Sequence, residues 1–389
     1  MKNILLIISC VAMILCSCST YEQALKTQCL DCPVEQGNYK HADRLKPLFD
    51  ELLSHGVPGV AVAIYSPEGS WEYASGLAKI EDRSPMTSGH LHYLQSIAKT
   101  YLAVAVLQLH EAGKITLDAP ITQYLSTDQH KHITRAQDMT VRMLLNHTSG
   151  MAEYNSDPGY LAQLLQHPDR YFTAQDFLEV ISGKPVMFEP GSRYAYCNMN
   201  YEVLALITDA ITGDHTRFIT EQILKPLALN ATYYRNEAGY LTYDRLYNAY
   251  WDRYSDGILE NVSQMQRTNV STMVGDDGIV STPMDAVLFL KGLVEQKLIK
   301  KETLAMMHEG FANDSGKVEY GLGLDHGVFA DYPAVGHSGG GLGAGCQLYY
   351  FPHNDTYFFL GINMGTVTGS PIQDKALPVL NKVHAILAE

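Results

Sequence analysis

Two short motifs in this sequence each contain a serine that could act as a nucleophile. Residues 336–340, GHSGG, fit the G-x-S-x-G pattern of a nucleophile elbow, in which the serine stands on a sharp turn between a strand and a helix. Residues 96–99, SIAK, fit S-x-x-K, in which a lysine amine can take the proton of the serine. Both patterns are short, so the residues around them must decide which serine reacts.

The surroundings of Ser338 do not suit an elbow. The segment GGGLGAG follows the serine and leads into CQLYYFP, which has the composition of a strand. Three consecutive glycines disfavour the helix that an elbow requires. His353, Asp355 and Asp374 lie downstream, so chain order alone leaves a serine triad open. We interpret Ser338 as a residue that does not attack the substrate.

The surroundings of Ser96 favour catalysis. A separation of three places Ser96 and Lys99 on one face of a helix, where the amine can reach the hydroxyl. The run from Thr100 to Leu109 is apolar almost all round, which predicts a buried helix. Burial lowers the pKa of a lysine toward the range of a neutral base, and unpaired N–H groups at a helix start can hold an oxyanion. The alternative is a surface serine beside a lysine whose head reaches water.

A second motif, Tyr196-Cys197-Asn198, stands just before a helical segment. In an extended turn the period of two points Tyr196 and Asn198 to the same side. We interpret Cys197 as a packing residue, because a free cysteine behaves as a small hydrophobic side chain.

The segments that must position these residues predict an α/β fold with a mostly antiparallel sheet. GVPGVAVAIYS and SWEYASGLAKI predict a hairpin, and strands return in the last eighty residues before a closing helix. The stretch between them, roughly residues 85–310, predicts an inserted all-helical subdomain, with Thr282 as N-cap and Pro283 as first residue of its clearest helix. Strands at both ends around a helical middle indicate one catalytic unit over residues 41–389.

The first residues predict export. Lys2 precedes an apolar run from Ile4 to Leu15, which is too short for a comfortable membrane span and is typical of a secretory signal. Leu15-Cys16-Ser17-Cys18 resembles a lipobox, so we expect a lipoprotein signal peptide at residues 1–17, a lipid on Cys18 that binds the membrane, and a tether at residues 18–40. Cleavage without a lipid is the alternative. In the tether, Cys29 and Cys32 are expected to form a local disulfide or to remain two free thiols.

Composition and charge exclude several classes of partner. The formal net charge is −14, and the acidic residues are scattered, so nucleic acid is not an expected partner. His90 with His92 and His130 with His132 form H-x-H pairs without a third ligand, and we expect no metal and no cofactor. The sequence gives no sign of an obligate protein partner. We expect His147, in NHTSG, to form structural hydrogen bonds.

The motifs together resemble the penicillin-recognising serine hydrolases. Ser96-x-x-Lys99, Tyr196-x-Asn198 and His337-Ser338-Gly339 occur in the order and rough spacing of the branch that holds class C β-lactamases, D-alanyl-D-alanine carboxypeptidases, D-amino-acid amidases and esterases. GVPGVAVAI, LLNHTSGM, VGDDGIVSTPMD and YGLGL are similar to that family too. The similarity spans about residue 40 to the end and implies a β-lactamase/transpeptidase-like fold.

The resemblance also implies a role for each motif. Ser96 would be the acylated nucleophile, with Lys99 and Tyr196 as the proton-transfer pair; which of the two is the base stays open. Asn198 would hold the substrate amide. Residues 337–340 would line the substrate cleft, where Ser338 and Gly339 lie beside the substrate and the N–H groups of Ser96 and Gly340 form the oxyanion hole.

His337 stands where class C β-lactamases usually have a lysine, which weakens the case for efficient β-lactam hydrolysis. We expect its imidazole to hydrogen-bond a substrate carboxylate and to change charge near pH 6.5. The sequence thus predicts an exported, lipid-anchored serine hydrolase of small-molecule or peptide substrates, with D-alanyl peptides of the cell wall first. A β-lactamase or a carboxylesterase is the alternative within this chemistry. A non-catalytic penicillin-binding or sensor lipoprotein is the alternative outside it, and the intact Ser96, Lys99 and Tyr196 argue against that.

Overall fold

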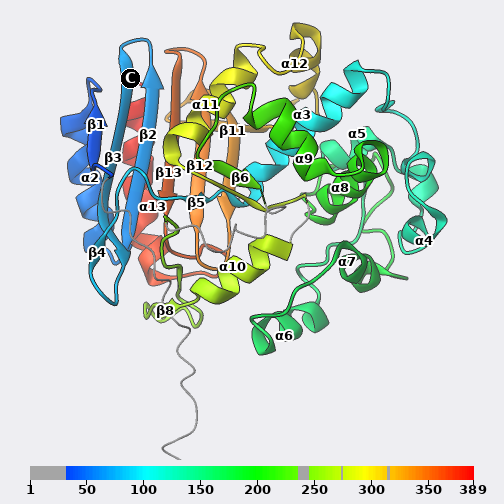
Figure 1. Ribbon diagram of the computed structural model, residues 1–389, viewed down its shortest axis with the longest axis horizontal. Helices are drawn as coiled ribbons and strands as arrows, with labels where there is room; N and C mark the ends of the chain where they lie inside the picture. Colours follow the sequence, from blue (N-terminus) through cyan, green and yellow to red (C-terminus); the bar gives the residue numbers. More distant parts are fainter. Residues whose placement is uncertain (1–31, 235–244, 273–274, 313–315) are drawn as a thin grey trace, which may run out of the picture.

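An eight-stranded antiparallel sheet forms the framework of the computed structural model (Figure 1), which describes residues 32–234, 245–272, 275–312 and 316–389. The strand order is β1-β3-β2-β13-β12-β11-β10, and β4 pairs with β3 at one end. The strands are β1 (Glu35–Gly37), β2 (Gly59–Ser66), β3 (Gly69–Lys79), β4 (Ser84–Pro85), β10 (Asp325–Phe329), β11 (Tyr332–Gly340), β12 (Gly345–Phe351) and β13 (Thr356–Ile362). The predicted α/β class with a mostly antiparallel sheet is confirmed.

The two ends of the chain meet in the middle of this sheet. β2 and β3 form the predicted hairpin, and Val62 on β2 lies opposite Tyr73 on β3. On its other side β2 pairs with β13, where Leu360 is the partner of Val62. Strands that are almost three hundred residues apart are therefore neighbours, and the chain between them must leave the sheet and return.

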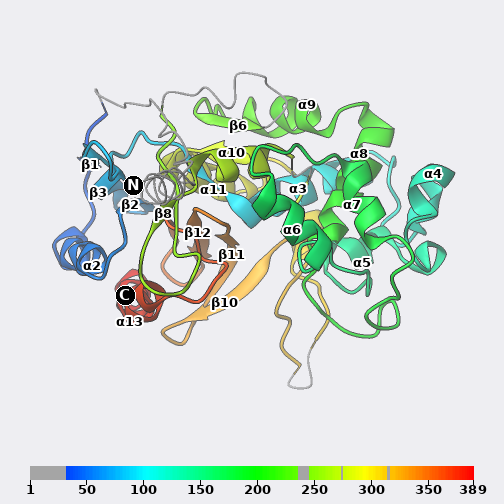
Figure 2. The same ribbon diagram turned by 90° about the horizontal axis from the view of Figure 1, so that it is seen from below.

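Helices cover both faces of the sheet (Figure 2). α2 (Ala42–Ser54) and α13 (Pro371–Leu387) pack on one face and enclose an apolar core with it. α11 (Pro283–Val294) packs on the opposite face against β2, β12 and β13. The side chain of Thr282 accepts the N–H of Asp285 at 3.4 Å and Pro283 is the first helical residue, so the predicted start of α11 is confirmed.

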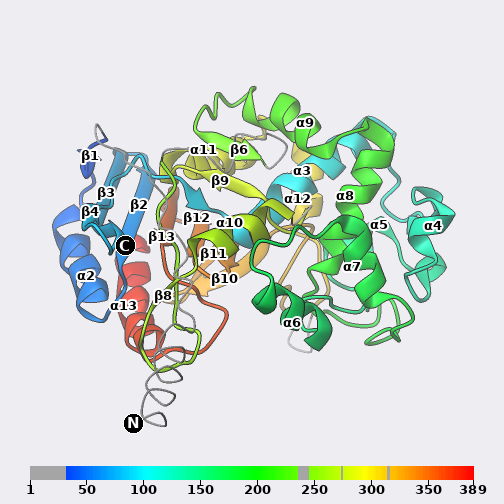
Figure 3. The ribbon, with the colours of Figure 1, turned by 60° about the horizontal axis from the view of Figure 1, so that its bottom comes forward.

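The segment between β4 and β10 forms a lobe beside the sheet, except for α11, which covers a face of the sheet (Figure 3). Its helices are η1 (Gln95–Ile97), α3 (Ala98–Glu111), η2 (Ile121–Gln123), α4 (Thr127–His130), η3 (Ala136–Asp138), α5 (Val141–Leu145), α6 (Pro158–Gln166), α7 (Ala174–Ile181), α8 (Met199–Thr212), α9 (His215–Ile219), η4 (Thr220–Leu224), α10 (Ser263–Thr272), α11 and α12 (Lys301–Met307). The predicted insertion is therefore mainly helical.

The insertion is not all-helical, and that part of the prediction is corrected. It also contains the short strands β5 (His92–Tyr93), β6 (Thr232–Tyr234) and β9 (Ile279–Ser281), which form a three-stranded sheet, and the ribbon of β7 (Tyr250–Trp251) with β8 (Glu260–Asn261). Two or three residues are too few to show the alternation that identifies a strand in a sequence.

α3 runs through the centre of the lobe and is buried on nearly every side, as its apolar composition predicts. η1 precedes it directly and contains Ser96. Gln95 has a φ of +52°, a conformation that side chains other than glycine adopt rarely and that persists only where the surroundings enforce it. β5 and η1 thus present Ser96 at the start of a buried helix.

The N-terminal predictions fall largely outside the described residues. The signal segment, Cys18 and Cys29 lie before residue 32. The tether predicted at residues 18–40 is too long, because β1 (Glu35–Gly37) lies within it and pairs with β3. Cys32 is disulfide-bonded, which excludes a free thiol at that position. Among the described residues, no helix combines the length and the apolar character that crossing a membrane requires.

Candidate active site

The amine of Lys99 is the centre of a hydrogen-bonded cluster. Its side chain has no exposed surface. Nζ lies 2.9 Å from Oγ of Ser96, 2.8 Å from Oδ1 of Asn198 and 2.9 Å from the backbone carbonyl oxygen of Asp276. The structure therefore brings the first and second motifs together around one nitrogen atom.

The hydrogen-bonding chemistry of these partners fixes how the N–H groups and the lone pair of Lys99 are oriented. Asn198 Oδ1 and the carbonyl of Asp276 can only accept hydrogen bonds, so each takes one N–H of Lys99. A neutral amine has two N–H groups and one lone pair, and the lone pair then faces the hydroxyl of Ser96. Burial is the largest influence on Lys99 and lowers its pKa, because it disfavours the charged form. This is the arrangement of a base that can take the Ser96 proton.

Tyr196 lies next to Lys99 and Ser96. Lys99 Nζ lies 5.2 Å from the centre of the Tyr196 ring, and Ser96 is near enough to the Tyr196 hydroxyl to lower its pKa. Tyr196 keeps 38% of its surface exposed, but its hydroxyl end is surrounded closely enough that desolvation raises its pKa well above 10. Tyr196 therefore carries its proton at neutral pH and can donate it.

Glu153, which the sequence did not single out, holds Asn198 in place. One carboxylate oxygen accepts the backbone N–H of Asn198 at 2.6 Å and its side-chain amide at 3.2 Å. The other oxygen accepts the N–H groups of Tyr154 and Asn155. Asn198 is thus fixed between Glu153 and Lys99 at the start of α8.

His147 supports the loop that carries Tyr196. Its Nδ1 accepts the backbone N–H of Cys197 at 3.2 Å and lies 3.1 Å from the amide nitrogen of Asn200. The rings of His147 and Tyr196 lie 4.2 Å apart between centroids. Cys197 is a buried free thiol within the hydrophobic core. The predictions that His147 is structural and that Cys197 is a packing residue are confirmed.

β11 brings His337 to the same cluster, but as a neutral ring. His337 is 3% exposed; Nδ1–H donates to the carbonyl oxygen of Ser338 at 2.6 Å, and Nε2 accepts the hydroxyl of Tyr320 at 2.9 Å. Burial, and then the charge of Lys99, lower its pKa to about 3. The predicted change of charge near pH 6.5 is therefore wrong, and the ring has no free N–H to offer a carboxylate.

Ser338 lies on the opposite face of the sheet from the cluster. Successive side chains of a strand alternate, so Ser338 points away from the face of His337 and Gly339. Tyr349 of the neighbouring strand β12 belongs to the core under α13, and Ser338 is near enough to its hydroxyl to lower the pKa of Tyr349. No described contact joins Ser338 to Lys99, which supports its interpretation as a serine that does not attack the substrate. Its predicted position beside the substrate does not agree with this orientation, because the side chain faces the other side of the sheet.

The glycines of β11 allow the strand to approach η1. A Cβ on Gly339 would lie 2.5 Å from the carbonyl oxygen of Leu94 and 2.8 Å from Cβ of Gln95, closer than side chains pack. Gly340 is exposed at the end of the strand. The close approach is consistent with the oxyanion hole predicted for Ser96 and Gly340, which stays a prediction.

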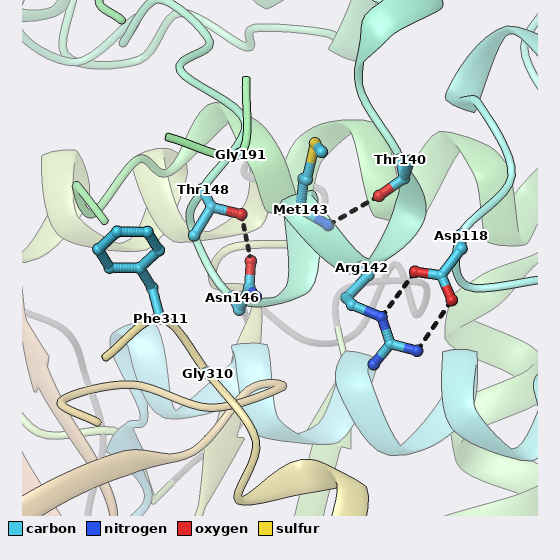
Figure 4. A pocket seen from close by; sticks show the side chains of 9 residues that line it. All are labelled: Asp118, Thr140, Arg142, Met143, Asn146, Thr148, Gly191, Gly310 and Phe311. Carbon is cyan, nitrogen blue, oxygen red and sulfur yellow. Dashed lines mark hydrogen bonds and ion pairs between the residues drawn. The ribbon is translucent and has the colours of Figure 1, made fainter. Parts of the chain in front are cut away.

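A recess of about 260 Å³ is lined in part by α5 and the residues on either side of it (Figure 4). Arg142 and Asp118 face each other across part of its wall in a two-point ion pair, with N–O distances of 2.7 and 3.1 Å. Thr148 donates to Asn146 in the same wall. No residue of the catalytic cluster lines the recess, so it offers no nucleophile.

The histidine pairs give no sign of a metal-ligand set in the part of the chain that the structure describes. His90 is buried and accepts the backbone N–H of Thr87. The one group of metal-ligand type there is Asp209, Asp214 and His215. Asp214 caps α9 and Asp209 accepts two bonds from His215, so their oxygens already have structural partners.

Residues 42–374 match the sequence family described as Beta-lactamase. This chain belongs to the beta-lactamase family. A relative in this family is penicillin-binding protein 4* of Bacillus subtilis, 25% identical over 84% of this chain and 72% of that protein. Esterase EstB of Burkholderia gladioli is 32% identical over 44% of this chain, and a putative D-alanyl-D-alanine carboxypeptidase of Escherichia coli O157:H7 is 28% identical over 60%. The matches span about half the length of these two relatives, 46% and 55%.

Solved structures show the same fold. A D-amino acid amidase from Ochrobactrum anthropi has a TM-score of 0.75 at 23% identity, with 89% of this chain and 99% of that chain covered. A D-stereospecific amidohydrolase from Streptomyces has a TM-score of 0.74 at 24% identity, with 87% and 98% covered. Family membership makes the chain a serine hydrolase of amide or ester bonds.

We expect a fluorophosphonate to label Ser96 and not Ser338, because Ser96 is the serine whose hydroxyl meets the Lys99 amine. Ser96→Ala should lower the rate of labelling about a thousandfold or more, as loss of a nucleophile does. Ser338→Ala is the matched control and should label at the wild-type rate. Peptide mapping by mass spectrometry locates the adduct, and an adduct on Ser338 that persists in Ser96→Ala would contradict the assignment.

We expect His337 to stay neutral from pH 8 down to pH 5, because its pKa is lowered to about 3. A histidine that is neutral in the folded state but protonates near pH 6.5 when unfolded reduces stability as the pH falls from about 6.5 toward 3. Two-dimensional ¹⁵N NMR of the ring, assigned with His337→Asn, should show the Nδ1–H tautomer throughout. Protonation with a midpoint near pH 6.5 would refute the buried, neutral state.

Proposed function

We propose that this protein is an exported acyl-transfer hydrolase of small amides and esters, with D-alanyl peptides as its first candidate substrates. The observation that carries the hydrolytic step is the buried Lys99 amine, 2.9 Å from Ser96 Oγ with its other two positions occupied by acceptors. The substrate class rests on the relatives, which include penicillin-binding proteins and a putative D-alanyl-D-alanine carboxypeptidase.

The geometry supports the following proton path. Ser96 Oγ bonds to the substrate carbonyl carbon as its proton passes to the lone pair of Lys99, which becomes an ammonium. The carbonyl oxygen becomes an oxyanion, held by the predicted N–H groups of Ser96 and Gly340. As the tetrahedral intermediate collapses, Tyr196 gives its proton to the leaving nitrogen or oxygen and recovers one from Lys99. The products are the acyl-enzyme and a neutral amine or alcohol.

Deacylation repeats the path with water. Water attacks the acyl carbon and gives a proton to Lys99, and the Ser96 oxygen leaves with a proton that returns through Tyr196. The acid product and the resting enzyme result, so protons balance over the cycle. Asn198 is proposed to exchange its bonds to Glu153 and Lys99 for a bond to the substrate amide.

Esters are a second candidate, and the neutral state of His337 favours them. Class C β-lactamases have a lysine cation in this position of the third motif, whereas His337 is uncharged here. A substrate with a free carboxylate therefore gains no ion pair from this residue. Esters and amides without a carboxylate form no such ion pair, so the replacement of the lysine by a neutral histidine does not weaken their binding.

Export and anchoring are part of the proposal. The apolar run from Ile4 to Leu15 behind Lys2 supports a secretory signal, and Cys18 is proposed to carry the lipid. The first described strand, β1, begins at Glu35, and we propose that the residues between Cys18 and this strand form the tether between a membrane and the enzyme.

Four substrates test the proposal: a p-nitrophenyl ester, an acetylated D-alanyl-D-alanine peptide, its L,L isomer and nitrocefin. We expect hydrolysis of the ester and of the D,D-peptide. The kcat/KM for the D,D isomer should exceed that for the L,L isomer by about tenfold or more, because the side chains of the wrong isomer do not fit a site shaped for the other. Because His337 does not titrate there, the ratio of kcat/KM for peptide and ester should be constant from pH 5.5 to 8.

Ser96→Ala is the matched control for background hydrolysis. Equal rates for the two peptide isomers would contradict the substrate class, and ester turnover without peptide turnover would select the esterase alternative. A protein that none of the four substrates acylates would be the non-catalytic alternative.

A further inference from the structure

Asp276 brings a carboxylate to Lys99 in addition to its backbone carbonyl. Oδ2 lies 4.0 Å from Lys99 Nζ, and the two side chains are 4% and 0% exposed. The hydroxyl of Tyr154 donates to Oδ2 at 2.9 Å. Among the described residues, Oδ1 is buried without a hydrogen-bond partner. A buried negative charge favours a positive charge beside it, and Lys99, which becomes an ammonium when it takes the Ser96 proton, lies 4.0 Å away.

Other charged and aromatic groups also act on Lys99. These groups are Asp277, Glu153, Glu202, His147 and His337, together with the rings of Tyr196 and Tyr201. Glu153 already accepts four N–H groups. Burial and the charge of Asp276 raise the pKa of Asp277, and the Asp277 carboxyl accepts the backbone N–H of Gly278 at 2.7 Å. Both histidines are neutral because burial lowers their pKa.

We propose that Asp276 is a positioning residue for the catalytic amine: its carbonyl orients Lys99 toward Ser96, and its carboxylate stabilises the ammonium that forms when Ser96 is acylated. The inference rests on the proposed acylation of Ser96 and deepens it. The step moves one proton, because Ser96 loses it and Lys99 gains it beside the Asp276 side chain.

The carboxylate and the burial of Lys99 act in opposite directions. Burial favours the neutral amine, whereas a negative charge at 4.0 Å favours the ammonium. Without the carboxylate, Lys99 would lose its proton at a lower pH but would be a weaker base. The two roles of Asp276 are separable, because a substitution of the side chain leaves the backbone carbonyl in place.

Asp276→Asn tests the charge at nearly constant shape. The measurement is kcat/KM for a p-nitrophenyl ester from pH 5 to 10, which reports the ionisation of the free enzyme. In the acid limb of this profile, kcat/KM rises with pH as Lys99 loses its proton. We expect this limb to move to lower pH by about one unit or more. The plateau should fall by about three- to tenfold, because a base of lower pKa accepts a proton less readily. A residue that only supported the fold would lower the plateau without moving the limb.

Asp277→Asn is the matched control, since it changes the same group in the next, equally buried residue. The acid limb of its pH profile should move clearly less than that of Asp276→Asn, because no described ion pair joins the Asp277 carboxyl to Lys99, whereas Oδ2 of Asp276 lies 4.0 Å from Nζ. An unmoved limb in Asp276→Asn, or an equal shift in Asp277→Asn, would overturn the proposal.

Tyr154→Phe gives an independent test if Asp276→Asn does not fold, as judged by its thermal transition. Tyr154→Phe removes the hydroxyl that donates a hydrogen bond to Oδ2 of Asp276. Oδ2 then interacts more strongly with Lys99, so the pKa of Lys99 and the acid limb of the pH profile should move to higher pH, opposite to Asp276→Asn. An unmoved limb here would also refute the role of Asp276. A wild-type protein that the ester does not acylate would contradict the proposed function itself, and this inference with it.

Discussion

The burial of one amine is the constraint on which the site depends. Lys99 has no exposed surface, and a lysine in such a place must be neutral or paired. Its three neighbours within 2.9 Å come from three separate parts of the chain: η1, the start of α8 and the segment before β9. The amine can act as a base only while all three are in position.

The architecture supplies that position from a distance. The two ends of the chain meet at β2 and β13, which makes the sheet continuous, and β11 at its far side approaches η1 through glycines. α3 carries Lys99 into the lobe because its apolar side chains are buried on nearly every side. The left-handed backbone of Gln95 presents Ser96 at the start of that helix. The site therefore combines β11 of the sheet with η1 and α3 of the lobe.

The sequence predicted what depends on local spacing and missed what depends on distant contacts. S-x-x-K and Y-x-N place their residues within a turn or two, so Ser96, Lys99, Tyr196 and Asn198 could be found. The state of His337 could not, because its burial and its bond to Tyr320 are made by tertiary packing. Glu153 and Asp276 are single acids in the sequence, and only folding places them at Asn198 and Lys99. Their segments, LLNHTSGM followed by Glu153 and VGDDGIVSTPMD, did carry family resemblance.

The titration of Lys99 itself tests the central claim most directly. Lysine labelled with ¹⁵N at Nζ and ¹³C at Cε, with the Lys99 resonance identified by Lys99→Arg, allows the amine to be followed by NMR from pH 6 to 11. The account predicts that Lys99 loses its proton below the usual value of 10.5, because burial outweighs the nearby carboxylates. A Lys99 that remains an ammonium above pH 10.5 would contradict its role as the base for Ser96.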